Sequence, residues 1–256
     1  MTRIVAWNIM MGGGDRIEGI ADALASLDPS VVVLTEVTGG RVPEVAAALA
    51  RVGIPHSVDS VAGCADPKRR GVLIASTTKP EVLPWTTAPN ESFEARVLRA
   101  QVGDLAVMGI LAPSTEDLSP AFYEWLVPEA HEWLGDDAFI IGDFNAGHPG
   151  EVNVHEYFMQ LVDDGWADAL RLHSPEADAT SHWISSGGVA LDHCLVAGQL
   201  RDRVQFAEIP AELNGMPTAA RADRRTLFVE PDGPGFLRLT VIDARGAADS
   251  VMVRLQ

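Results

Sequence analysis

Four apolar segments of this 256-residue sequence are expected to end in polar side chains that are suited to joint chemistry. These side chains belong to Asn8, Glu36, Asp143 with Asn145, and Asp192. Each of them alone is typical of a turn or a cap. Adjacent strands of a packed sheet bring their ends to one rim, where clustered carboxylate and amide groups are unfavourable unless they bind a cation. Oxygen ligands select Mg²⁺ or Mn²⁺ over zinc, so the pattern predicts a divalent-metal site.

Short apolar runs alternate with longer segments of helical periodicity, which indicates an α/β protein. Strands are expected at residues 3–9, 31–34, 71–76, 97–102, 105–111, 138–141 and 189–197. Helices are expected at residues 16–27, 43–52, 123–134 and 155–163. After a linker at 214–221, residues 236–244 and 250–255 alternate like two strands of a hairpin. The sequence thus predicts a domain over residues 1–212 and a C-terminal β segment over 213–256 that completes it or is appended to it.

Composition limits the classes of partner. Lys and Arg number 19 against 36 Asp and Glu, which gives a formal net charge of −17. Duplex DNA gains affinity from clustered cations, so tight binding of duplex DNA is not expected. The one dense basic cluster is Lys68, Arg69 and Arg70. Two distant cysteines, Cys64 and Cys194, fit a reducing compartment, and the sequence shows neither a secretory leader nor a membrane-spanning run. We expect a cytoplasmic monomer that makes no contact with membranes.

The order of five short motifs in the sequence resembles that of a known family. These motifs are Trp7-Asn8-Ile9, Leu34-Thr35-Glu36-Val37, Gly71-Val72-Leu73-Ile74, Gly142-Asp143-Phe144-Asn145 and Leu191-Asp192-His193-Cys194-Leu195. In this order they resemble the endonuclease/exonuclease/phosphatase superfamily, the DNase I-like proteins that include exonuclease III-like members, over about residues 1–212. The resemblance implies a four-layer α/β/β/α sandwich of two mainly antiparallel sheets, followed here by the C-terminal β-hairpin.

The resemblance also implies roles for the polar residues. Glu36 would be the main ligand of Mg²⁺ or Mn²⁺, with Asn8 beside it. Asp143 would orient or deprotonate the attacking water, Asn145 would hold the scissile phosphate, and Asp192 would pair with a C-terminal histidine. The implied function is metal-dependent hydrolysis of a phosphodiester or phosphomonoester, by in-line attack of water. The acidic charge favours a phosphorylated small molecule or single-stranded nucleic acid as the substrate.

The C-terminal part departs from the family pattern, which usually has Ser-Asp-His before the last core strand. The candidate in that place is Asp223-Arg224, where Asp223 would keep a metal-side carboxylate. Arg224 cannot act as a general base, but it can bind phosphate. Alternatively, residues 213–256 resemble the small Ig-like domain that ends bifunctional penicillin-binding proteins, and Asp223 then has no role in the site.

The absent histidine bears on activity. Loss of a general acid or base typically lowers a rate by about 10²–10⁴-fold. His148 and His182 are the candidates for a substitute base, whereas His193 is expected to pack on the strand face opposite Asp192. The alternative function is therefore that of a catalytically impaired family member, which binds a phosphorylated ligand or a protein partner.

Overall fold

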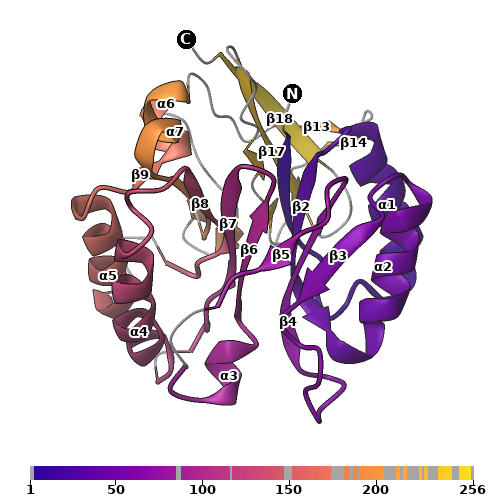
Figure 1. The fold of residues 1–256 in the computed structure, drawn as a ribbon, viewed down its shortest axis with the longest axis horizontal. Coiled ribbons are helices and arrows are strands. Elements are labelled where there is room, and N and C mark those ends of the chain that lie inside the picture. Colours follow the sequence, from indigo (N-terminus) through magenta and orange to yellow (C-terminus); the bar gives the residue numbers. More distant parts are fainter. Residues whose placement is uncertain are drawn as a thin grey trace.

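The computed structural model of the protein describes most of the N-terminal 204 residues and several C-terminal strands. The described residues are 3–84, 88–115, 117–146, 152–173, 182–184, 187–189, 191–204, 212–213, 216–217, 225–226, 228–229, 236–243 and 248–254. Two β-sheets lie face to face, and helices cover the outer face of each (Figure 1). The α/β sandwich of four layers expected from the sequence is confirmed.

The first sheet is formed mainly by the N-terminal part of the chain. Its strands are β1 (Ile4–Asn8), β2 (Val31–Thr38), β3 (His56–Asp59), β4 (Arg70–Ser76) and β16 (Phe228–Val229), in the spatial order β16-β1-β2-β4-β3. The helices α1 (Ile17–Ser26) and α2 (Val42–Arg51) cover its outer face (Figure 1). Two short 3₁₀ turns, η1 (Gly14–Arg16) and η2 (Gly39–Arg41), precede these helices. Because α1 connects β1 to β2, these two strands are parallel and their carboxyl ends lie side by side, with Asn8 opposite Thr35.

The second sheet follows in sequence. Its strands are β5 (Glu81–Val82), β6 (Val97–Val102), β7 (Leu105–Leu111), β8 (Ala138–Asp143), β9 (Ala167–Asp168) and β12 (Asp192–Val196), in the order β5-β6-β7-β8-β12-β9. The helices α4 (Ser119–His131) and α5 (Val152–Asp163) pack on its outer face (Figure 1). The remaining helices of this part are the short α3 (Glu91–Glu94), α6 (Ala169–His173) and α7 (Gly198–Arg203). Strands β7 and β8 are parallel, and the other pairs in this sheet are antiparallel.

Alternation along the strands produces three separate cores. In β1, Ile4 and Ala6 belong to the core between the two sheets, whereas Val5 and Trp7 belong to the core under α1 and α2. Since both faces of the strand are buried, its sequence is apolar throughout rather than alternating. A third core lies between the second sheet and α4 with α5. Gly109 in β7 brings the sheets close together, since a Cβ there would lie 2.6 Å from a methyl carbon of Val72.

A buried ion pair connects the second sheet to α4. Nη1 of Arg99, in β6, lies 2.9 Å from Oε2 of Glu129, and the two side chains are only 8% and 7% exposed. The Arg99 guanidinium also stacks on Trp133, with 4.2 Å between its central carbon and the ring centroid. Burial lowers the pKa of Arg99, and the negative charge of Glu129 opposes that shift.

The C-terminal strands are short apart from two. The pairs β10 (His182–Ile184) with β11 (Gly187–Val189), and β13 (Glu212–Leu213) with β14 (Met216–Pro217), each form a two-stranded ladder. A three-stranded sheet contains β15 (Arg225–Thr226), β17 (Phe236–Asp243) and β18 (Ala248–Arg254). The hairpin of β17 and β18 agrees with the expected strands. The preceding strand, β16, pairs antiparallel with β1 and so extends the first sheet.

Some element bounds differ from those expected. The helix expected at 123–134 is α4, which begins at Ser119 because Pro120 is accommodated in its first turn. The single strand expected over 189–197 is divided, since Val189 belongs to β11 and the strand of the second sheet begins at Asp192. In the described part of the chain, the helices are all too short or too polar to cross a membrane.

Candidate active site

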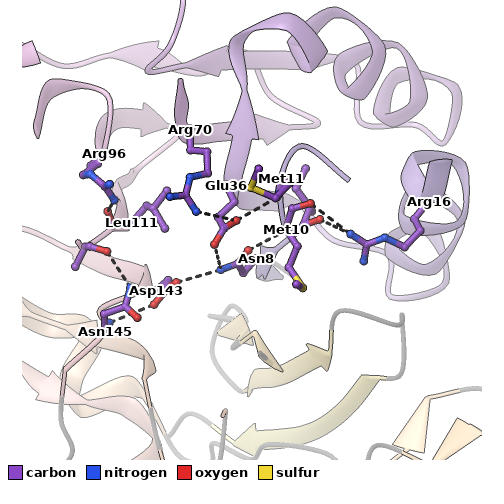
Figure 2. Close-up of polar contacts among 12 residues, drawn as sticks. Asn8, Met10, Met11, Arg16, Glu36, Arg70, Arg96, Leu111, Asp143 and Asn145 are labelled. Atoms are coloured by element: carbon purple, nitrogen blue, oxygen red, sulfur yellow. Dashed lines mark hydrogen bonds and ion pairs between the residues drawn. The ribbon is translucent and has the colours of Figure 1, made fainter. Parts of the chain in front are cut away.

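Asn8 connects the two sheets at the rim where their strands end. Its Nδ2 donates to Oε1 of Glu36 at 3.2 Å and to Oδ2 of Asp143 at 3.0 Å (Figure 2). Its Oδ1 accepts a hydrogen bond from the backbone N–H of Met10 at 3.0 Å. Asn8 is fully buried. One amide therefore orients a carboxylate from each sheet, and the predicted cluster of Asn8, Glu36 and Asp143 is present as one group.

Glu36 is the extra residue of a β-bulge. In the pairing of β2 with β4, Thr35 lies opposite Val72 and Val37 opposite Gly71, so Glu36 has no residue directly opposite it. Its φ of 58° is in the left-handed region, which non-glycine residues rarely adopt. Bulges redirect a side chain out of the regular alternation. Strand β2 is buried along its length, and the bulge allows it to place the Glu36 carboxylate at the rim.

The loop after β1 holds the other oxygen of Glu36. The backbone N–H of Met11 donates to Oε2 of Glu36 at 3.1 Å, and the N–H of Gly12 donates to the Glu36 carbonyl at 2.8 Å. Met10 and Met11 both have positive φ, near 51° and 52°. Arg16 stabilises the turn by donating to the carbonyl of Ile9 at 2.8 Å. Among the described non-glycine residues, four of the five with positive φ belong to this site, which indicates that backbone strain is concentrated there.

Asp143 and Asn145 lie at the end of β8. Oδ1 of Asp143 accepts a hydrogen bond from the backbone N–H of Asn145 at 3.2 Å, and Nδ2 of Asn145 donates to the carbonyl of Ala112 at 2.8 Å. Asn145 has a φ of 46°. Gly142, with a φ of 140°, allows this geometry, because a Cβ there would collide with the carbonyl oxygen of Ile110. The amide of Asn145 is thus fixed at the rim beside Asp143.

Asp192 lies directly opposite Asp143 in the antiparallel pairing of β12 with β8. Residues opposite one another in a ladder project from the same face of the sheet. The Asp192 side chain is buried, with 2% of the residue exposed. The structure therefore brings together all five residues that the sequence placed at the rim in its described part: Asn8, Glu36, Asp143, Asn145 and Asp192.

His193, the next residue, has the packing role expected for it. Its Nδ1 lies 3.1 Å from Oδ2 of Asp168, and its Nε2 lies 3.0 Å from the carbonyl oxygen of Ala146. The ring packs against Phe144 and Phe158. It holds the segment after Asn145 from the side opposite the carboxylate cluster.

Two arginines at the rim were not predicted as site residues. Nη1 of Arg70, the first residue of β4, lies 3.4 Å from Oε2 of Glu36. Nη1 of Arg96, between α3 and β6, donates to the carbonyl of Leu111 at 3.1 Å (Figure 2). The sequence signal for Arg70 was the basic cluster at residues 68–70, directly before a strand. Arg96 carried no comparable signal.

Several predicted site residues cannot be placed. His148, Asp223 and Arg224 lie outside the described residues, and His182 is in β10 but its side chain is not described. Their roles as metal ligand, phosphate-binding residue and substitute bases therefore stay predictions.

Comparison with known proteins identifies what the chain is similar to. The family model for the Endonuclease/Exonuclease/phosphatase family matches residues 5–214. The model of the Penicillin-Binding Protein C-terminus Family matches residues 201–255. Both resemblances expected from the sequence are confirmed. The domain boundary expected after residue 212 stays a prediction. Comparison with curated proteins finds no match.

Many solved structures share the fold, including the following three. An AP endonuclease from Archaeoglobus fulgidus has 19% sequence identity and a TM-score of 0.71, covering 82% of this chain and 91% of its own. A variant of the 3′ phosphatase NExo from Neisseria, bound to a product DNA hairpin, has 18% identity and a TM-score of 0.73. The 3′-5′ exonuclease NExo from Neisseria meningitidis has 20% identity and a TM-score of 0.73. Each of the last two comparisons covers 100% of both chains.

Proposed function

We propose, from the premise that the chain belongs to the Endonuclease/Exonuclease/phosphatase family, that it hydrolyses phosphoester bonds with the help of a divalent cation. The observation that carries the proposal is the hydrogen-bonded group of Glu36, Asn8 and Asp143, which joins carboxylates from two sheets through one buried amide. A buried cluster of this kind is unfavourable unless it serves a cation or a reaction.

The residues present fit Mg²⁺ or Mn²⁺. Within the described ranges there is no group of three or more His, Cys, Asp or Glu side chains arranged to hold a metal ion. Mg²⁺ does not need such a cage, because it usually keeps several waters and binds one or two carboxylates together with substrate phosphates. Glu36 would be the main ligand, with Asn8 beside it, and Asp223 is a further candidate outside the described residues. When bound, the cation would neutralise charge on the phosphoryl oxygens.

The chain's own residues supply the remaining chemistry. Asp143 would accept the proton of the attacking water, because its carboxylate is already oriented by Asn8 and by the Asn145 backbone. The Asn145 side chain, fixed by its hydrogen bond to Ala112, would bind the scissile phosphate. Asp192, opposite Asp143, would add a second negative charge beside it. The protein has a formal net charge of −17, which disfavours tight binding of duplex DNA. The substrate of the proposed reaction is therefore a phosphorylated small molecule or single-stranded nucleic acid.

The test is hydrolysis by the purified full chain. Release of p-nitrophenol from bis-p-nitrophenyl phosphate and p-nitrophenyl phosphate is measured with Mg²⁺, with Mn²⁺ and after removal of metal by a chelator. We expect chelation to lower turnover by about 10²-fold or more, since the charge on the phosphoryl oxygens then has no cation. Glu36→Gln protein, purified in the same way, controls for contaminating hydrolases. Turnover that persists in chelator, or that is equal in the Glu36→Gln protein, would contradict the proposal.

One observation favours the second candidate, a phosphate-ligand binder without turnover. Glu36 already contacts a protein cation, Arg70, at 3.4 Å, so its charge is partly balanced without a metal ion. A binder of this kind would take up phosphate, with or without Mn²⁺, and release no product from either substrate. Release of p-nitrophenol together with binding of phosphate indicates an enzyme, whereas binding of phosphate without release of p-nitrophenol indicates a binder.

A further inference from the structure

Arg70 contacts the carboxylate cluster from a position that leaves it accessible. Its guanidinium lies 3.4 Å from Oε2 of Glu36, yet the Arg70 side chain is 43% exposed whereas that of Glu36 is 7% exposed. Partly exposed ion pairs of this kind contribute little to stability, so the guanidinium can leave the carboxylate at small cost. The buried carboxylate stays in place because Asn8 and the Met11 N–H hold it.

Arg96 provides a second cation beside the same cluster, and it is fixed. It directly precedes β6, is half-buried, and donates to the Leu111 carbonyl at 3.1 Å. The pKa of Arg96 is lowered, mainly by burial and then by the positive charge of Arg70, while Asp143 and Glu36 act in the opposite direction. Both guanidiniums therefore lie on one side of the group, with that of Arg70 against Glu36 (Figure 2).

We infer that Arg70 is a movable cation that Glu36 and the phosphate of the substrate share. When Glu36 has no other cation, Arg70 neutralises it. When a divalent cation occupies Glu36, Arg70 turns from the carboxylate and donates to a phosphate oxygen, next to the fixed charge of Arg96. This inference rests on the proposed function and assigns to it a phosphate-binding residue.

The chemistry of the side chain supports the exchange. A guanidinium has five donors in a planar fork that suits carboxylate and phosphate oxygens alike. Arg70 and a divalent cation compete for the Glu36 carboxylate, so Arg70 weakens metal binding. When the Arg70 guanidinium instead contacts phosphate, it strengthens phosphate binding. Removing Arg70 must therefore have opposite effects on metal and on phosphate.

The experiment measures both affinities in the full-length wild type and in Arg70→Gln. Binding of Mn²⁺ alone is measured by electron paramagnetic resonance. Binding of inorganic phosphate is measured by calorimetry at saturating Mg²⁺. In Arg70→Gln we expect Mn²⁺ to bind about two- to fivefold more tightly, and phosphate to bind about tenfold more weakly.

Two further variants make the result specific. Arg51→Gln removes a similar charge from an ion pair on α1 and α2, where Arg51 is 49% exposed and contacts Glu18 and Asp22; neither affinity should change. Arg70→Lys keeps the charge, so its Mn²⁺ affinity should stay near that of wild type. If Arg70→Gln weakens both ligands, or changes neither, the inference is wrong and Arg70 supports the site only structurally.

Failure of this inference differs from failure of the proposed function. If the wild type hydrolyses phosphoesters but Arg70→Gln leaves both affinities unchanged, the inference fails and the function stands. If the affinities change in opposite directions while no variant releases product, Arg70 is shared as inferred and the chain is a binder rather than an enzyme.

Discussion

Replacing Glu36 with Gln is expected to lower metal-dependent phosphoester hydrolysis by about 10³-fold and to remove most Mn²⁺ binding, with the fold unchanged. The substitution keeps the shape of the side chain and its oxygen for the Met11 N–H, but it removes the negative charge. With that oxygen at the Met11 N–H, the NH2 group of Gln faces the NH2 group of Asn8, so the hydrogen bond that Asn8 donates to Oε1 of Glu36 is lost unless one of the two amides turns. The measurements are kcat/KM at saturating Mn²⁺ and the affinity for Mn²⁺ itself.

The backbone strain at Glu36 is the same in the wild type and in Glu36→Gln, so it does not account for a difference in activity between them. Gln and Glu have the same backbone cost at the left-handed φ of 58°, so this strain contributes nothing to any change in the free energy of unfolding. Glu44→Gln on α2 is the matched control, because Glu44 is an exposed acid that pairs with Arg41 away from the cluster. Equal rates in wild type and Glu36→Gln would show that the cluster at the rim is not where the chemistry occurs.

Replacing Arg99 with Ala is expected to lower the free energy of unfolding by about 3–5 kcal/mol. The substitution leaves the carboxylate of Glu129 buried without its ion-pair partner, and it removes the stacking of the guanidinium on Trp133. The pair connects β6 to α4, so its removal should weaken the packing of the second sheet against its helices. Equilibrium denaturation in urea, followed by circular dichroism, measures the change.

A double substitution separates the unpaired charge from general damage to packing. Arg99→Met combined with Glu129→Leu removes both charges, and such apolar replacements of buried pairs are often neutral or stabilising. We expect the double variant to recover most of the stability lost in Arg99→Ala. Arg51→Ala, at the exposed pair with Asp22, should lose far less stability than Arg99→Ala. A loss as small as this in Arg99→Ala would show that the Arg99–Glu129 pair does not support the fold.

The succession of strands along the chain and the membership of the cluster were predictable because they follow from simple patterns. Asn8 and Glu36 come at the ends of apolar runs, and a helix between parallel strands brings such ends together. Asp143 and Asn145 come at the end of another buried run. The resemblance to a family placed these runs in two facing sheets, which periodicity alone did not.

The contacts within the cluster were not predictable from the sequence. The bulge at Glu36 depends on the pairing of β2 with β4, which no local pattern encodes. The bridging role of Asn8 depends on the distance between the two sheets. The position of Arg96 beside the cluster depends on the turn between α3 and β6. These features arise from tertiary packing, which overrides local propensity.

The division of the carboxylates between two sheets has a consequence for how the chain can be cut or recombined. Strands β1 to β4 end at Ser76, and the strands of the second sheet begin at Glu81, so the two sheets come, apart from β16, from consecutive stretches of sequence. Each stretch has its own helices and its own outer core. Asn8 and Glu36 come from the first stretch, and Asp143 comes from the second. Neither stretch contains the complete group, so a gene fragment that encodes only one of them lacks part of it, and the hydrolysis that we propose would require both stretches.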